Sequence, residues 1–125
     1  MILSKFKIPL YNVYVTYVII ESSKDYNDLA KVVKSIRLDK EQSDRCLEIV
    51  KRDCVNGGDT IRQLNYRKIF CIIYRCTSDT IRKDIICHEK RHIEDRILEY
   101  FHVNDIESAG LLAGFLGLKM LNYKK

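Results

Sequence analysis

Several features that would assign this 125-residue chain to a common functional class are missing. No long block of like charges accompanies its formal net charge of +5, which argues against a nucleic-acid-binding arm or a polybasic membrane anchor. Its five cysteines include no Cys-x-x-Cys pair, and five is an odd number, so we expect neither a disulfide framework nor a cysteine zinc site. Lys5, Lys7 and Pro9 interrupt the apolar first twenty residues and no small-residue cleavage site follows, so we expect neither a signal peptide nor a membrane span.

What remains predicts one small globular domain over residues 1–125. The composition, 46% hydrophobic and 31% charged, is typical of a soluble protein with one hydrophobic core. The cysteines are interpreted as reduced and mostly buried, which places the protein in the cytoplasm of a bacterium or of an infected host cell. Scattered basic residues and few exposed aromatic platforms argue against nucleic acid as the partner, and no membrane partner is expected.

Hydrophobic periodicity predicts an α+β fold with a small antiparallel sheet. Alternating β-branched and aromatic residues predict a strand over residues 12–20, with Pro9 at its entry. Residues 60–64 and 68–76 are β-prone and separated by a short polar segment, so they predict a hairpin. No repeat or linker is visible.

Four segments carry helix signals. Leu29, Val32, Val33 and Ile36 form the stripe of a first amphipathic helix after a Ser/Asp capping segment. A second helix is expected from Asp39 to the Asn-Gly-Gly sequence at residues 56–58. Ser78 or Asp79 caps a third helix, whose apolar residues are Ile81, Ile85, Ile86, Ile93 and Ile97, and Asn104 or Asp105 opens a fourth that runs to about Tyr123.

The third helix carries the pattern His-Glu-x-x-His at residues 88–92. Residues four apart lie on the same face of a helix, so His88 and His92 can reach one metal ion. Zinc accepts neutral imidazole nitrogen and prefers tetrahedral coordination, which leaves room for a further ligand and a water molecule. Glu89, about 100° around the helix from His88, can instead act as general base on that water, whose pKa zinc lowers to about 7.

The same pattern can also occur on a surface helix, where Glu, Lys, Arg and His are simply charged or polar side chains in contact with solvent. Against that alternative, the composition of this chain produces the pattern by accident in roughly 4 chains per thousand. The histidines also lie about 130° from the centre of the apolar stripe of their helix, so we expect them to face a cleft rather than the core.

The third metal ligand must come from outside the motif helix, and Glu107 is the best candidate. Gly110, Gly114 and Gly117 share its helical face and would let the motif helix approach closely. The alternative for Glu107 is a capping box with Asn104. His102 is the reserve ligand.

These residues resemble the gluzincin branch of the zincin metallopeptidases, in which a glutamate on a following helix completes the His-Glu-x-x-His site. The stretch 88–92 followed by residues 105–109 resembles the compact versions found in small phage- and mobile-element-encoded proteins and in antirepressor-type peptidases. The resemblance covers roughly residues 66–118. It implies a strand, here 68–76, bordering the cleft so that an extended peptide or protein substrate can pair with its edge.

Two functions follow from this reading. The first is a zinc metallopeptidase with His88, His92 and Glu107 as metal ligands and Glu89 as the catalytic base. The second is a non-catalytic zincin-like binding module, such as a phage accessory or structural protein. Lys90 and Arg91 replace the small or apolar pair usual inside the motif, and no downstream His or Tyr matches a transition-state stabiliser, so the sequence leaves both functions open.

Overall fold

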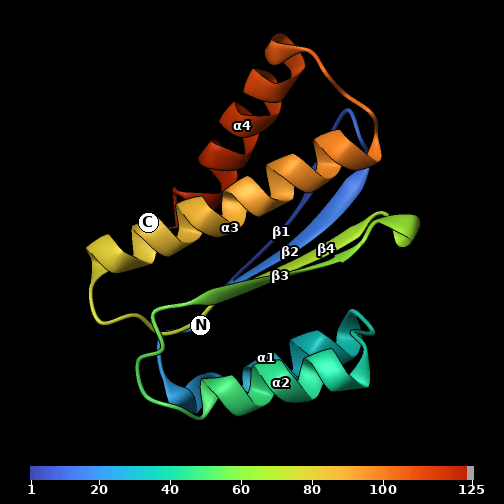
Figure 1. Cartoon of the computed structure of the whole chain (residues 1–125). Helices are drawn as coiled ribbons and strands as arrows, with labels where there is room; N and C mark the ends of the chain where they lie inside the picture. Colours follow the sequence, from blue (N-terminus) through green and yellow to red (C-terminus); the bar gives the residue numbers. More distant parts are fainter. Residues whose placement is uncertain (124–125) are drawn as a thin grey trace.

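The computed structural model describes residues 1–123, which form a sheet covered by helices (Figure 1). In chain order the elements are β1 (Ile2–Ile8), β2 (Val13–Ile19), the 3-10 turn η1 (Ser23–Asp25), α1 (Tyr26–Ser35), α2 (Lys40–Val50), β3 (Gly58–Gln63), the 3-10 turn η2 (Leu64–Tyr66), β4 (Lys68–Ile73), α3 (Asp79–Tyr100) and α4 (Ile106–Met120). The α+β class is therefore confirmed.

The sheet is mixed rather than wholly antiparallel, and its strand order is β1-β2-β4-β3. β1 pairs antiparallel with β2, and β3 pairs antiparallel with β4, as the predicted hairpin requires. β2 and β4, however, are parallel neighbours, with Val15 opposite Ile69 and Ile19 opposite Ile73. The difference arises because the chain crosses over through α1 and α2 before the hairpin docks by its second strand, which is buried from Ile69 onward.

Helices cover both faces of the sheet: α3 and α4 lie on one side, and α1 and α2 on the other (Figure 1). The buried apolar residues accordingly form two clusters rather than the single core expected from the sequence. The first cluster joins Ile86, Ile93 and Ile97 of α3 to the sheet face that carries Val15 and Ile73. The second joins α1 and α2 to the opposite face. Two buried faces explain why the central strands are apolar at nearly every position.

Local signals account for the helix starts. Ser78 caps α3, its hydroxyl accepting the N–H of Ile81 at 3.1 Å, and Asp39 caps α2 by accepting the N–H of Gln42. No residue breaks the helical pattern after Ser78, so α3 continues for 22 residues to Tyr100. Within residues 1–123, neither α3 nor another helix combines the length and apolarity that crossing a membrane requires.

The first strand was missing from the sequence prediction. In β1 the residues alternate between half-buried and exposed, with Phe6 turned inward and Lys5 and Lys7 outward. This is the period-2 signal of an edge strand with one buried face. Pro9 consequently lies in the turn between β1 and β2, not at the entry of an isolated strand.

Candidate metal centre

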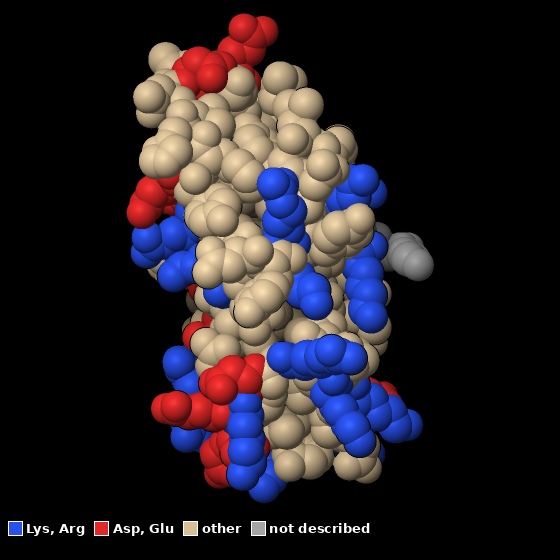
Figure 2. Space-filling model, turned by 90° about the vertical axis from the view of Figure 1, so that its right-hand side faces the viewer, with Lys and Arg blue, Asp and Glu red and all other residues tan. Residues whose placement is uncertain are grey.

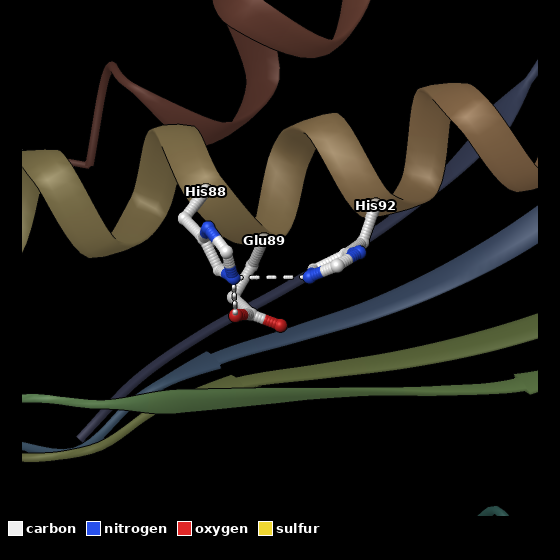
Figure 3. Close-up of side chains that lie close together, drawn as sticks. All are labelled: His88, Glu89 and His92. Atoms are coloured by element: carbon white, nitrogen blue, oxygen red, sulfur yellow. Dashed lines mark hydrogen bonds and ion pairs between the residues drawn. The ribbon is translucent and has the colours of Figure 1, made fainter.

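His88 and His92 project together from one flank of α3 (Figure 3). Both side chains are exposed and lie outside the core, and their Nε2 atoms are 3.0 Å apart. The two rings meet edge to face, with centroids 4.5 Å apart. With Glu89 they form a cluster whose potential ligand atoms all lie within 4.8 Å of one another, and no other such trio of His, Cys, Asp or Glu occurs among residues 1–123.

The spacing of the two imidazoles suits a shared metal ion. Two nitrogen ligands at 2.0–2.1 Å from a tetrahedral zinc ion stand about 3.3 Å apart. The Nε2 atoms of His88 and His92 are 3.0 Å apart, so small side-chain rotations would accommodate such an ion. The exposed side of the pair leaves room for water or substrate as a further ligand. The two imidazoles could therefore hold a zinc ion and would leave at least one further coordination position.

Glu89 is the buried member of the cluster, with 5% of its surface exposed. Its Oε1 accepts a hydrogen bond from the Thr60 hydroxyl at 2.8 Å, and its Oε2 lies 3.9 Å from Nε2 of His88. The Thr60 hydroxyl has one proton to donate. Oε1 of Glu89 is nearer to this hydroxyl than the Cys71 sulfur, which lies 3.8 Å away, so the hydroxyl donates to Glu89. Burial raises the pKa of the Cys71 thiol, which therefore stays protonated beneath the site. One carboxylate oxygen is thus held by β3 while the other faces the imidazoles.

A glycine makes room for this carboxylate. A Cβ atom at Gly58 would lie 2.8 Å from the carbonyl oxygen of Ile72 and 3.0 Å from Cγ of Glu89. Both distances are shorter than ordinary van der Waals contact, so a larger residue would displace either the backbone of β4 or the Glu89 side chain. Gly58 begins β3, which places the Glu89 side chain directly against an edge strand.

β3, and not the predicted segment 68–76, borders the site. β4 lies between β2 and β3 and has both edges paired, so it offers no free backbone to a peptide. β3 is an edge strand, and its Thr60 touches Glu89. The sequence favoured the more apolar strand of the hairpin, but apolar residues on both faces are the mark of a central strand.

The structure does not bring Glu107 to the histidines. Glu107 lies in the first turn of α4, is exposed, and does not belong to the His88–Glu89–His92 cluster. α4 contacts α3 through its last turns, where Gly117 lies near Lys90. Lys90 is about 160° around α3 from both histidines, and Figure 3 shows α4 on the side of α3 away from the imidazoles. Among the described residues, the predicted ligand trio of His88, His92 and Glu107 is therefore not assembled.

Two of the three glycines on α4 do not contact α3. Cβ atoms at Gly110 and Gly114 would meet nothing within 4 Å, and only Gly117 lies near the motif helix. The buried face of α4 is instead formed by Leu112, Leu116 and Met120. Apolar burial thus decided the orientation of the helix, and the predicted packing of the glycines against the motif helix occurs at Gly117 but not at Gly110 or Gly114.

Neither the capping box predicted for Glu107 nor the reserve ligand His102 is found at its expected place. The N-cap of α4 is Asp105, whose carboxylate accepts the N–H of Ser108 at 2.8 Å, so Asn104 and Glu107 form no capping box. His102 is exposed, has a left-handed backbone with φ of 56°, and also stays outside the cluster. Because α3 runs to Tyr100, the following connection begins about 12 Å beyond His92 along the helix axis.

The two basic residues inside the motif have structural roles. Lys90 pairs with Glu94 at 2.6 Å, and both side chains are largely buried. Arg91 pairs with Asp95 at 3.2 Å on the exposed face. Both are i,i+4 pairs that support a helix. Both cations are thus paired with carboxylates of the same helix rather than with His88 or His92.

Thr60 and Gly58 were missed by the sequence analysis. Both belong to a weakly β-prone segment, and their only sequence signal is the turn-forming Gly57-Gly58 pair. Nothing local indicates that this segment would lie against residue 89, since the two are 29 positions apart in the chain. Only the pairing of β3 with β4 brings them together.

Comparison with protein-family models, curated proteins and solved structures finds no match to this chain. The His88–Glu89–His92 cluster, its burial and its position beside β3 are therefore the observations on which a function can be argued.

Proposed function

We propose that the protein is a zinc-dependent peptidase whose metal is held by His88 and His92. The observation that carries the proposal is the pair of Nε2 atoms 3.0 Å apart beside a buried carboxylate oxygen, Oε2 of Glu89, 3.9 Å from one of them. Zinc bound there would polarise a carbonyl group and lower the pKa of a bound water. The rest of the reaction depends on residues of this chain.

Glu89 has the position and the orientation of a general base. The Thr60 hydroxyl holds Oε1, which leaves Oε2 directed at the space in front of the imidazoles. Oε2 would take a proton from the attacking water as its oxygen adds to the peptide carbonyl carbon. The same carboxylic acid would then give the proton to the amine nitrogen as the C–N bond breaks. Low exposure of Glu89 keeps competing solvent away from the carboxylate.

The free edge of β3 suits a peptide substrate. An extended peptide can add to an exposed sheet edge through backbone hydrogen bonds, which select for extended chains without regard to sequence. On β3 this edge lies beside Thr60, and therefore within a few ångströms of Glu89 and the histidines. A backbone carbonyl of the bound peptide would then lie near the metal ligands.

A non-catalytic metal-binding module is the second candidate. The observation that favours it is the missing third protein ligand, because Glu107 and His102 both lie outside the cluster. In that case Glu89 would act as a ligand through Oε2, completing a trio from one helix, and no base would remain to activate water. The five free cysteines suit a reducing compartment in either case, and we infer a cytoplasmic protein.

The variant Glu89→Gln separates the two candidates. If Glu89 is the base, the variant should bind zinc with nearly unchanged affinity and lose hydrolysis of a fluorogenic peptide mixture by a factor of about 100 or more. If Glu89 is a ligand, zinc affinity should fall as well. Glu94→Gln is the matched control, since Glu94 lies more than one helical turn from Glu89 along α3 and pairs with Lys90. Unchanged turnover in Glu89→Gln would remove Glu89 from the mechanism.

A further inference from the structure

An open cavity of about 420 Å³ lies beyond the histidines, where the end of β3 meets the end of α3. It is lined by Arg62, Gln63, Leu64, Asn65, Tyr66 and Tyr100. Five of these six residues belong to the edge strand β3 and to η2, and Tyr100 comes from the last turn of the motif helix. The cavity therefore continues the surface between β3 and α3 that holds Glu89.

The cavity lies next to the His88–Glu89–His92 cluster along the edge strand β3. Side chains alternate along β3, so Gly58, Thr60 and Arg62 share the face turned toward α3. Thr60 bonds to Glu89, and Arg62 follows about 6.6 Å farther along the strand. On α3, Arg96 stands one turn beyond His92, on the same flank. β3 and α3 thus run in the same direction from the cluster to the cavity.

The residues at and beside this cavity carry a surplus positive charge. Arg96 pairs with Glu99 at 3.3 Å, whereas Arg62 has no ion pair within residues 1–123. Partial burial, with the nearby charge of Arg96, lowers the pKa of the Arg62 guanidinium, and Glu99 acts in the opposite direction. An arginine nevertheless remains charged in a protein. The two arginines and the single glutamate leave one uncompensated guanidinium at the cavity.

The walls are suited to a polar ligand with an aliphatic stem. Tyr66 is 74% exposed and Tyr100 is 44% exposed, so both rings and hydroxyl groups are available. The planar guanidinium of Arg62 presents paired N–H donors that match the two oxygens of a carboxylate. A hydrophobic ligand would leave that cation without a partner, and a basic one would meet it as a like charge.

We propose that this cavity is a carboxylate-binding subsite that selects substrates with an acidic group next to the cleaved bond. The inference rests on the proposed peptidase function. Side chains on one face of an extended peptide recur about every 6.6 Å, which is the separation between Thr60 and Arg62 along β3. A substrate residue within two positions of the cleaved bond therefore places its side chain at Arg62. The carboxylate is that of Asp or Glu, or the C-terminus of a short peptide.

The test uses zinc-loaded protein and peptide sets that differ at the positions within two residues of the cleaved bond, analysed by mass spectrometry. In C-terminally amidated peptides, Glu should be preferred to Gln by about tenfold in kcat/KM, and Lys should be worse than Gln. Arg62→Glu should invert the preference toward Lys. Arg52→Glu, the same charge change at an exposed residue with no ion pair among the described residues, should leave the preference as in the unaltered protein. Selectivity for free-acid over amidated ends would assign the subsite to a terminal carboxylate.

Binding separates this inference from the peptidase proposal. In Glu89→Gln protein, which should not turn over, fluorescence anisotropy of labelled peptides should show the same preference for Glu over Gln, removed by Arg62→Glu. Cleavage or binding that ignores the acidic residue would overturn the subsite and leave the peptidase standing. Absence of cleavage with a retained, Arg62-dependent preference would support the subsite in a binding module and refute catalysis. Neither cleavage nor preference would refute both.

Discussion

Zinc should stabilise the folded protein through His92 and without Glu107. A ligand that binds only the folded state at 100 times its Kd adds about 2.7 kcal/mol to the free energy of unfolding. Unfolding entropy of about 2.1 cal/mol/K per residue amounts to roughly 0.26 kcal/mol/K for 125 residues. The melting temperature should therefore rise by about 10 °C at that zinc concentration.

The variants locate the ligands. His92→Ala removes one of two nitrogen atoms that stand 3.0 Å apart, so less than about 2 °C of the zinc-dependent shift should remain. Glu107→Ala should keep the full shift, because Glu107 is exposed in the first turn of α4 and lies outside the His88–Glu89–His92 cluster. Without zinc, both variants should melt close to the unaltered protein, since both side chains are exposed.

The assay is differential scanning fluorimetry of untagged protein at increasing zinc concentrations, with zinc content measured by elemental analysis. A full shift in His92→Ala would show that the ion binds elsewhere. Loss of the shift in Glu107→Ala would refute the placement of α4 and would restore the gluzincin site predicted from the sequence. A shift lost only in His92→Ala would identify the imidazoles as the protein ligands.

Three further substitutions test the surroundings of the site. Thr60→Val removes the hydroxyl bound to Glu89, which should cost about 1–3 kcal/mol of stability and lower kcat, while Thr60→Ser should restore both; equal kcat in all three proteins would contradict a positioning role for Thr60. Gly58→Ala should lower the stability measured by urea unfolding by about 1–3 kcal/mol, because its Cβ would lie 2.8 Å from the Ile72 carbonyl oxygen; a neutral result would mean that the strand relaxes freely. Gly114→Leu should be neutral or stabilise α4 by up to about 1 kcal/mol with zinc binding unchanged, because its Cβ faces open space; impaired zinc binding would show that α4 packs on α3 through its glycines.

Features that depend on neighbouring residues in the chain were determined by the sequence itself. The i,i+4 spacing of His88 and His92 places both imidazoles on the same face of the helix wherever the helix lies, which allows their Nε2 atoms to come within 3.0 Å of each other. The helix starts at Ser78 and Asp39 follow from side chains that accept the backbone N–H three residues farther along the chain. The α+β class and the β3–β4 hairpin follow from the periodicity of apolar residues.

The tertiary structure alone decided which segments surround the motif. Glycine spacing on α4 was compatible with close helix packing, but burying Leu112, Leu116 and Met120 leaves Gly110 and Gly114 facing open space and Glu107 on the surface. The sheet order, with β4 inside and β3 at the edge, places Thr60 against Glu89. Burial of apolar area is non-directional, and many arrangements of the same elements satisfy it locally. Only packing of the whole chain selects the one that places β3, and not α4, beside the histidines.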